Sequence, residues 1–132
     1  MTTENILKKI IVLTDVHILS GGGTIIGIDP VERLQTAVAH INMTSGDADL
    51  LVITGDLTHW GDPGSYTLLK QLLAPLKMPV RLLIGNHDLR DNFLAAFPEN
   101  PKDPNGFVQF AEDIGDWRLI GLDSSTSMQA LH

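Results

Sequence analysis

Hydrophobic positions along the chain fall into short continuous runs and into stretches with helical spacing. The runs KKIIVLT (8–14), LLVIT (50–54) and VRLLI (80–84) are short and rich in branched apolar residues, which predicts strands buried on both faces. Between these runs, apolar residues recur at helical intervals, first at Leu34, Ala37, Val38 and Ile41 and then at Leu68, Leu69, Leu72, Leu73 and Leu76. The pattern therefore predicts strands that alternate with helices.

Both predicted helices begin with an aspartate followed by a proline. Asp29 and Asp62 suit the position before the first turn, because a carboxylate there accepts hydrogen bonds from backbone N–H groups. Pro30 and Pro63 suit the first turn itself, and Glu32 completes a capping box in the first helix. SGDAD (45–49) ends the first helix, and Pro75 and Pro79 end the second.

The last third of the chain predicts a short helix and a pair of strands. NFLAAF (92–97) is typical of a helix that stops before Pro98, and residues 98–106 form a turn-rich connection. The runs 106–112 and 117–123 are expected to pair antiparallel, the first with one solvated face. Because helices join the first three strands, those strands are expected to be parallel with right-handed crossovers. The predicted fold class is α/β, with a mostly parallel sheet and flanking helices.

Composition and charge narrow the chemistry that this fold can carry. The chain has 132 residues, with 43% hydrophobic and 19% charged residues, which fits one globular domain. Its formal net charge of −7 argues against binding of nucleic acid, which needs clustered Lys and Arg. With no cysteine, thiolate metal sites and disulfides are excluded, so His, Asp, Glu and Asn remain as metal ligands. An acidic chain can bind a phosphate ester if metal ions supply positive charge.

The N-terminal sequence gives a prediction about location. MTTENILKKI is polar, and the apolar run that follows is short and ends at Asp15, so no signal peptide is predicted. No segment approaches the length of a membrane span, and we expect a cytoplasmic protein with no membrane partner.

Polar side chains follow each of the first three predicted strands. TDVH, TGDLTH and GNHD come directly after the strands at 8–14, 50–54 and 80–84. Carboxyl ends of parallel strands lie at one edge of a sheet, so these motifs are expected to converge there. The converging residues are Asp15, His17, Asp56, Asn86 and His87.

Two divalent metal ions would explain why carboxylates and imidazoles gather at one edge. Without a cation, crowded carboxylates raise one another's pKa and lower stability. Asp15 and His17 are spaced to hold one ion, Asp56 can bridge two, and Asn86 offers an amide oxygen to the second. Ions about 3.5–4 Å apart clamp a phosphoryl group and generate a hydroxide nucleophile. His87 is then placed to protonate the leaving oxygen or to stabilise the transition state.

These motifs resemble those of the calcineurin-like metallophosphoesterase superfamily. The finer similarity is to its cyclic-nucleotide phosphodiesterase and glycerophosphodiesterase branch, through TDVH, GIDPVERL, VITGDLTHWGDPGSY, LLIGNHD and WRLIGLDSS. The resemblance implies a four-layer αββα sandwich of which about half is here. It also implies hydrolysis of small phosphoesters by two divalent ions, with iron, manganese, zinc and cobalt all suited to mixed oxygen and nitrogen ligands. Under it, Asp15, His17, Asp56 and Asn86 are metal ligands and His87 is the catalytic histidine.

The chain stops at LDSSTSMQALH, where the family pattern would continue. The lone histidine and the G-H-x-H motif that the family carries on later strands are absent, so we expect a single truncated domain over residues 1–132. Fewer ligands predict weaker metal binding and activity far below that of a chain with all of them. An open sheet face predicts self-association, with a homo-oligomer as one form.

Several other residues have competing interpretations. His59 either lines a substrate pocket or is a solvated loop residue, whereas His40 lies off its helix's apolar stripe and is expected at the surface. GGG (21–23) favours a loop near the site over a phosphate cradle, and Trp60 favours packing over stacking on a base. Asp88 is expected to support neighbouring groups, and Asp123 to be structural. The glycines Gly55 and Gly85 are expected to let the backbone approach the ions.

The leading hypothesis is a metal-dependent phosphodiesterase acting on cyclic nucleotides or glycerophosphodiesters. A phosphomonoesterase or nuclease of the same fold is the alternative within chemistry. A non-catalytic scaffold is the alternative outside it, and the presence of all five motif residues argues against that scaffold.

Overall fold

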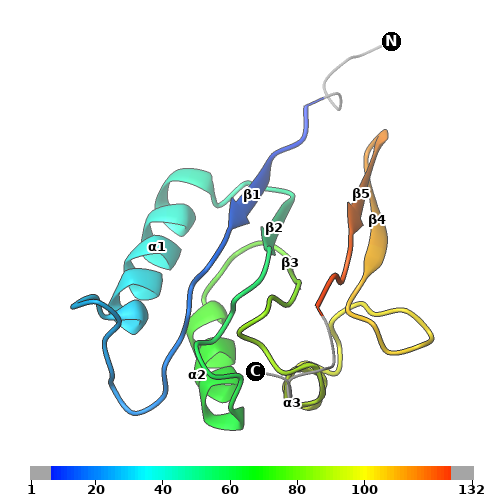
Figure 1. The fold of residues 1–132 in the computed structure, drawn as a ribbon. Helices are drawn as coiled ribbons and strands as arrows, with labels where there is room; N and C mark the ends of the chain where they lie inside the picture. Colours follow the sequence, from blue (N-terminus) through cyan, green and yellow to red (C-terminus); the bar gives the residue numbers. More distant parts are fainter. Residues whose placement is uncertain (1–6, 126–132) are drawn as a thin grey trace.

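The computed structural model describes residues 7–125 as an α/β fold built on a three-stranded parallel sheet (Figure 1). Strands β1 (Ile10–Leu13), β2 (Leu50–Ile53) and β3 (Val80–Leu82) pair in the order β1-β2-β3, and both pairings are parallel. Helices α1 (Pro30–Ser45) and α2 (Pro63–Leu73) connect them, and α3 (Arg90–Ala96) follows β3. The predicted fold class and order of elements are confirmed.

The aspartate-proline signals begin both long helices as predicted. The Asp29 carboxylate accepts hydrogen bonds from the backbone N–H groups of Val31 and Glu32 at the start of α1. Asp62 accepts hydrogen bonds from the backbone N–H and the hydroxyl of Ser65 at the start of α2. Burial disfavours the charged Asp62, but these hydrogen bonds outweigh it and hold the pKa of the carboxyl below its ordinary value.

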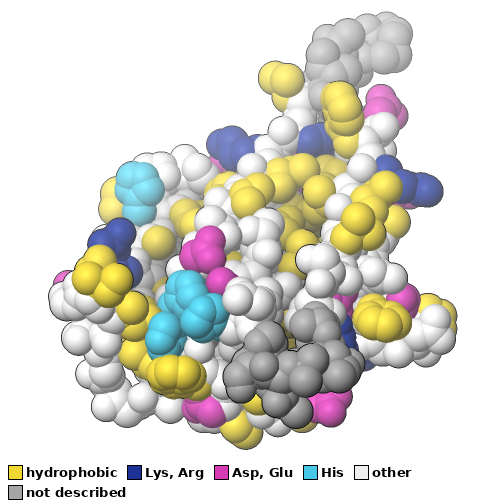
Figure 2. Space-filling model, in the orientation of Figure 1, with side chains coloured by type: hydrophobic (Ala, Val, Ile, Leu, Met, Phe, Trp, Pro, Cys, Tyr) yellow, Lys and Arg dark blue, Asp and Glu magenta, His cyan; other side chains and the backbone are white. Residues whose placement is uncertain are grey.

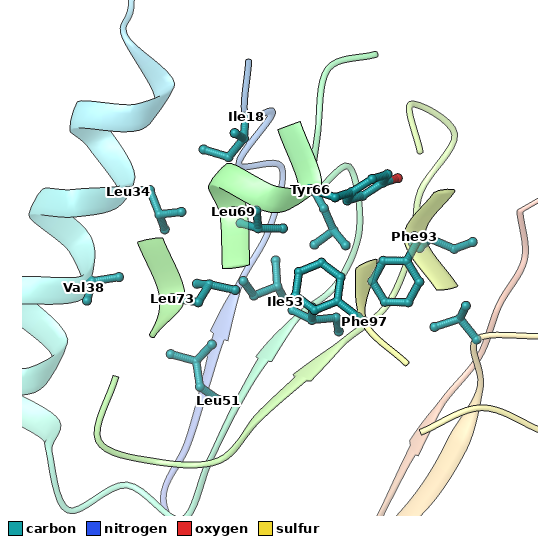
Figure 3. Packing of buried hydrophobic residues seen from close by; sticks show 14 of the residues in the cluster. Ile18, Leu34, Val38, Leu51, Ile53, Tyr66, Leu69, Leu73, Phe93 and Phe97 are labelled. Carbon is teal, nitrogen blue, oxygen red and sulfur yellow. The ribbon is translucent and has the colours of Figure 1, made fainter. Parts of the chain in front are cut away.

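The main core lies between one face of the sheet and the helices. Leu51 and Ile53 of β2 point into it, and α1 contributes Leu34 and Val38 (Figure 3). The α2 and α3 side is aromatic, because Tyr66, Phe93 and Phe97 pack edge-on or stacked with ring centroids 5.2–6.4 Å apart. This packing fixes the strand ends from which the polar motifs emerge.

A hairpin of β4 (Phe110–Ile114) and β5 (Trp117–Gly121) covers part of the opposite face of the sheet (Figure 1). Its strands are antiparallel, as predicted, although β4 begins four residues later than the predicted run at 106–112. Ile114 and Leu119 of the hairpin pack with Leu50, Val52 and Leu83. This second, smaller core therefore rests on β2 and the segment after β3.

The prediction that all three central strands are buried on both faces is wrong for β1 and β3. All four residues of β2 are buried, but Ile10 and Val12 of β1 are 37% and 60% exposed. Arg81 of β3 is half-buried and pairs with Glu112 of the hairpin at 2.6 Å. The reason is that the hairpin packs over β2 and the β3 side, so the outer face of β1 has no cover among residues 7–125. Within the same residues, no helix has the length and apolar character needed to cross a bilayer.

Candidate metal centre

The loops after β1 and β2 run side by side beyond the ends of the strands. The backbone N–H groups of Asp15 and His17 donate to the carbonyls of Gly55 and Asp56 at 3.1 and 2.9 Å. Ile18 continues the pairing with an N–H that donates to the Leu57 carbonyl at 3.0 Å. Two motifs that lie about forty positions apart in the sequence are therefore adjacent in space, at the edge predicted for them.

Three residues of these loops have left-handed backbone. The φ angles of Asp15, His17 and Asp56 are 57°, 47° and 49°. Residues with a Cβ adopt this region at a cost of about 1–3 kcal/mol each, and such strain concentrates where a site requires it. The strain therefore falls on three of the five residues that the sequence predicts for the site.

Asp15, His17 and Asp56 bring their ligand atoms together. His17 Nε2 lies 3.7 Å from an oxygen of Asp15 and 3.7 Å from an oxygen of Asp56. One ligand atom from each of the three residues lies within 4.8 Å of the others. A hydrogen bond from the Thr14 hydroxyl, 2.6 Å from Asp15 Oδ2, is the largest influence on Asp15 and lowers the pKa of its carboxyl. Two carboxylates and an imidazole in this arrangement suit a divalent transition metal.

His87 joins this group through both its backbone and its ring. Its backbone N–H donates to Asp56 Oδ1 at 3.0 Å, and its ring centroid lies 4.9 Å from that of His17. Its Nδ1 lies 2.9 Å from the His59 carbonyl oxygen, which can only accept a hydrogen bond. The proton of the neutral ring is therefore on Nδ1, and Nε2 carries the free lone pair.

Asn86 is exposed, one residue before His87. Among residues 7–125 its side chain forms no hydrogen bond, so the structure places it beside the site without fixing its amide. Its role as a metal ligand stays a prediction.

Asp88 is the residue that holds the motif loops together. Its side chain is fully buried and accepts hydrogen bonds of 2.9–3.0 Å from backbone N–H groups of Leu57, Thr58 and Gly85. The Tyr66 hydroxyl also donates to it at 3.0 Å, and burial together with the Asp88 carboxylate raises the pKa of Tyr66. The prediction that Asp88 supports its neighbours is confirmed.

Gly85 is required by the position of Asp56. A Cβ on Gly85 would collide with Oδ1 of Asp56 and lie 2.6 Å from its backbone nitrogen. The loop after β3 therefore approaches the loop after β2 more closely than any other residue type allows. The sequence interpretation expected Gly85 to let the backbone approach the ions. The structure gives it a different role, which is to allow this contact between two motifs.

His59 lies at the site and is the functional candidate that the sequence left undecided. Its Nδ1 is 3.4 Å from Nδ1 of His17, and its ring stacks on that of His87 with centroids 5.0 Å apart. Burial and then the neighbouring imidazoles of His87 and His17 lower the pKa of His59. The signal that could have identified it is the histidine that ends the second motif, TGDLTH, in a loop that pairs with the first. Figure 2 shows histidine side chains gathered on one face of the molecule.

The remaining sequence interpretations have mixed outcomes. The interpretation of Trp60 as a packed residue is wrong, because it is 68% exposed. Within residues 7–125 the aromatic ring nearest to it is that of His59, with centroids 4.6 Å apart. His40 is exposed on α1, and Gly21, Gly22 and Gly23 are exposed. Asp123 is structural as predicted, because its fully buried carboxylate pairs with both Nε and Nη2 of Arg90.

A cavity of about 480 Å³ adjoins Asp15 and His17. Its walls are mainly apolar and come from the end of β1, the loop before α1 and the first turns of α1, including Ile25, Ile28 and Leu34. Arg33 is the basic residue in its lining. The cavity has the size and character of a site for the organic part of a small molecule.

Comparisons with known proteins identify the family to which this chain is similar. A family profile described as calcineurin-like phosphoesterase matches residues 8–131. A probable cyclic nucleotide phosphodiesterase of Rhodopseudomonas palustris is 43% identical over 116 residues, covering 88% of this chain and 42% of the relative. A 3′,5′-cyclic adenosine monophosphate phosphodiesterase of Pseudomonas aeruginosa is 32% identical over 114 residues, covering 86% of this chain and 40% of the relative.

One further relative and one solved structure are also similar to this chain. A probable glycerophosphodiester phosphodiesterase of Arcobacter nitrofigilis is 33% identical over 119 residues, covering 88% of this chain and 43% of the relative. The purple acid phosphatase of yellow lupin seeds superposes with a TM-score of 0.62 at 15% identity, covering 94% of this chain and 26% of that one. This last likeness shows the fold alone. The chain spans about 40% of the length of the relatives that it matches.

Proposed function

The chain belongs to the calcineurin-like phosphoesterase family, and from this membership and the site geometry we propose that it carries ligands of a two-metal centre for phosphodiester hydrolysis. The observation that carries the proposal is the convergence of Asp15, His17 and Asp56, whose ligand atoms lie within 4.8 Å of one another. A bound cation would offset the negative charge of two carboxylates this close, and the imidazole beside them is a suitable third ligand.

Each residue has a distinct part in this proposal. Asp15, His17 and Asp56, whose side chains lie together, would hold metal, with Asp56 able to serve both ions, and Asn86 would offer its amide oxygen to the second. The bound ions would supply positive charge for the phosphoryl group and activate a water molecule as nucleophile. Asp88 keeps the loops after β2 and β3 in register so that Asp56 and His87 stay adjacent.

His87 is the proposed proton donor to the leaving oxygen. The His59 carbonyl fixes the proton on Nδ1, so Nε2 is the nitrogen that gains and loses a proton. The hydrogen bond from its backbone N–H to Asp56 keeps the ring beside the shared ligand. A histidine held at two points in this way presents one nitrogen in a constant direction.

A small phosphodiester is the proposed substrate class. The apolar cavity beside Asp15 and His17 suits an organic group, and Arg33 in its lining suits a negative one. The net charge of −7 disfavours a nuclease, which would have to attract a polyanion. Cyclic nucleotides and glycerophosphodiesters, the substrates in the names of the relatives, are therefore the preferred candidates.

The proposed roles are tested by measuring metal binding and hydrolysis separately. Asp56→Asn is expected to weaken Mn²⁺ binding roughly tenfold or more in calorimetry, because it removes the shared carboxylate. His87→Ala is expected to bind Mn²⁺ but to hydrolyse bis(p-nitrophenyl) phosphate roughly 100-fold more slowly, the usual contribution of a proton donor. His40→Ala, on the exposed side of α1, is the control. Unchanged Mn²⁺ affinity in Asp56→Asn would contradict the proposed centre.

Trp60 can distinguish the two substrate classes. Its exposed ring lies beside His59, and an aromatic side chain can stack on a nucleobase for about 1–3 kcal/mol. If the chain acts on cyclic nucleotides, Trp60→Ala should raise KM for 3′,5′-cyclic AMP roughly tenfold and leave KM for a glycerophosphodiester unaltered. Equal KM values for cyclic AMP in the two proteins would favour the glycerophosphodiester class.

A further inference from the structure

Three imidazoles surround a point on the side of His17 that faces away from Asp15 and Asp56. The ring centroids of His17, His59 and His87 are 4.9–5.4 Å apart, and all three side chains are half-buried. One ring nitrogen of each lies within 4.8 Å of the others. Within residues 7–125, His59 belongs to this group and to no carboxylate group at the site, so the proposed two-metal centre gives it no role.

His17 offers a different nitrogen to each group. Its Nε2 faces the carboxylates of Asp15 and Asp56, whereas its Nδ1 lies 3.4 Å from Nδ1 of His59. That separation is long for a hydrogen bond between ring nitrogens. It does match the distance of about 3.4 Å between two nitrogen ligands of a tetrahedral zinc ion with bonds of about 2.0–2.1 Å.

We propose that His17, His59 and His87 form an all-nitrogen metal site that takes zinc or another borderline-soft divalent ion. His87 contributes Nε2, because its Nδ1 donates to the His59 carbonyl. This carbonyl belongs to His59, which is itself a proposed ligand. The position of His59 therefore also determines the orientation of the His87 ring. A fourth ligand would be water, as in zinc sites with three protein ligands.

The two groups of ligands should prefer different ions. Imidazoles suit Zn²⁺ and Cu²⁺, whereas carboxylate oxygens also suit Mn²⁺. A neutral imidazole has one nitrogen lone pair to give, so His17 can serve one group only at a time. Zinc at the three-histidine site therefore removes His17 from the acidic group and occupies His87. The functional consequence rests on the proposed function and is that zinc bound at this site inhibits hydrolysis.

Separate variants isolate the two groups. Asp15→Asn removes a carboxylate from the acidic group and keeps a residue that tolerates positive φ, so Mn²⁺ affinity should fall roughly tenfold while Zn²⁺ binding remains. In the Asp15→Asn background, His59→Ala should lower Zn²⁺ affinity roughly tenfold or more. His59→Ala alone should change Mn²⁺ affinity far less than it changes Zn²⁺ affinity. Calorimetry with each metal alone measures all of these, with His40→Ala as the control for an exposed histidine.

Each outcome bears on a different idea. The three-histidine site is overturned if His59→Ala leaves the Zn²⁺ affinity unchanged. It is also overturned if His59→Ala lowers the affinities for Zn²⁺ and Mn²⁺ equally, because His59 would then only position His17. His59→Gln, which keeps a polar side chain without an imidazole nitrogen, must reproduce the zinc loss if the alanine variant unfolds. Failure of Asp15→Asn to weaken Mn²⁺ binding counts instead against the proposed function, and leaves the zinc result interpretable.

Discussion

Asp15, His17 and Asp56 show what single residues do at this site. With positive φ angles, their side chains leave two adjacent loops and come together at one point. The residues themselves could be predicted from their place after buried strands, since strand ends share one edge of a parallel sheet. Their backbone conformation could not, because few residues other than glycine adopt the left-handed region. The position of His59 at the site could not be predicted for a related reason, because it depends on hydrogen bonding between the loops after β1 and β2.

Gly85 offers the sharpest test of the close approach between motifs. In Gly85→Ala the new Cβ would collide with Asp56, so either the Asp56 side chain or the loop after β3 must move. We expect a loss of about 1–3 kcal/mol in the free energy of unfolding, typical of overpacking, together with weaker Mn²⁺ binding. Urea denaturation and calorimetry on the same samples measure both.

A matched substitution separates this contact from a general effect of alanine. Gly106 has positive φ and lies in an open turn, with no atom within 4 Å of an added Cβ, so Gly106→Ala introduces strain without touching the site. Mn²⁺ affinity should therefore fall in Gly85→Ala and stay near that of the unsubstituted chain in Gly106→Ala. Equal affinity in all three proteins would show that Asp56 adapts without loss.

At the scale of elements, the sequence predicted which segments form helices and strands, but it did not predict which of their faces are covered by other elements. The capping aspartates and prolines are local signals, and they mark the starts of α1 and α2 correctly. The burial of β1 is not local, since it depends on how far the hairpin extends over the sheet. An apolar run such as IIVL has the same pattern whether its outer face is packed or open, and here Val12 is 60% exposed.

The segment after β5 is joined to the start of α3 by the Arg90–Asp123 ion pair, which predicts a pH dependence of stability. Burial raises the pKa of Asp123, but hydrogen bonds from Arg90 and from the backbone of Val108 and Ser125 outweigh it and hold the pKa below its ordinary value of 3.8. A carboxyl with a lowered folded pKa stabilises the fold above its unfolded pKa, and this stabilisation is lost as pH falls through the folded pKa. The chain should therefore lose stability as pH falls below about 4, the ordinary pKa of a carboxyl, partly through Asp123.

Asp123→Asn tests this contribution. At pH 7 the variant should be less stable by about 3 kcal/mol, because the mostly buried guanidinium of Arg90 loses its charged partner. Its stability should then fall less steeply toward pH 3 than that of the unsubstituted chain, in guanidinium denaturation at a series of pH values. Asp113→Asn, in the exposed pair with Arg118, should have little effect at either pH. Parallel pH profiles for Asp123→Asn and the original chain would be the contrary result.

At the scale of the whole molecule, one face of the sheet carries apolar side chains that nothing among residues 7–125 covers. Ile10 and Val12 on β1 are 37% and 60% exposed, and Figure 2 shows hydrophobic side chains gathered between the sheet and the hairpin. β1 is also an edge strand, with β2 as its partner within the described residues. An apolar surface next to a strand edge favours association between copies of a chain.

We therefore predict that this chain self-associates through that face, with the net charge of −7 opposing association at low salt. Sedimentation velocity over a range of concentrations should show larger species, more of them as added salt screens the charge. Val12→Lys should shift the distribution toward monomer, because a charged side chain in a dry interface loses its hydration. Met43→Lys, an equal change of charge at a residue 80% exposed on α1, should leave association in place. If the two lysine variants behave alike, net charge rather than the open face controls association, since only Val12 lies on the sheet.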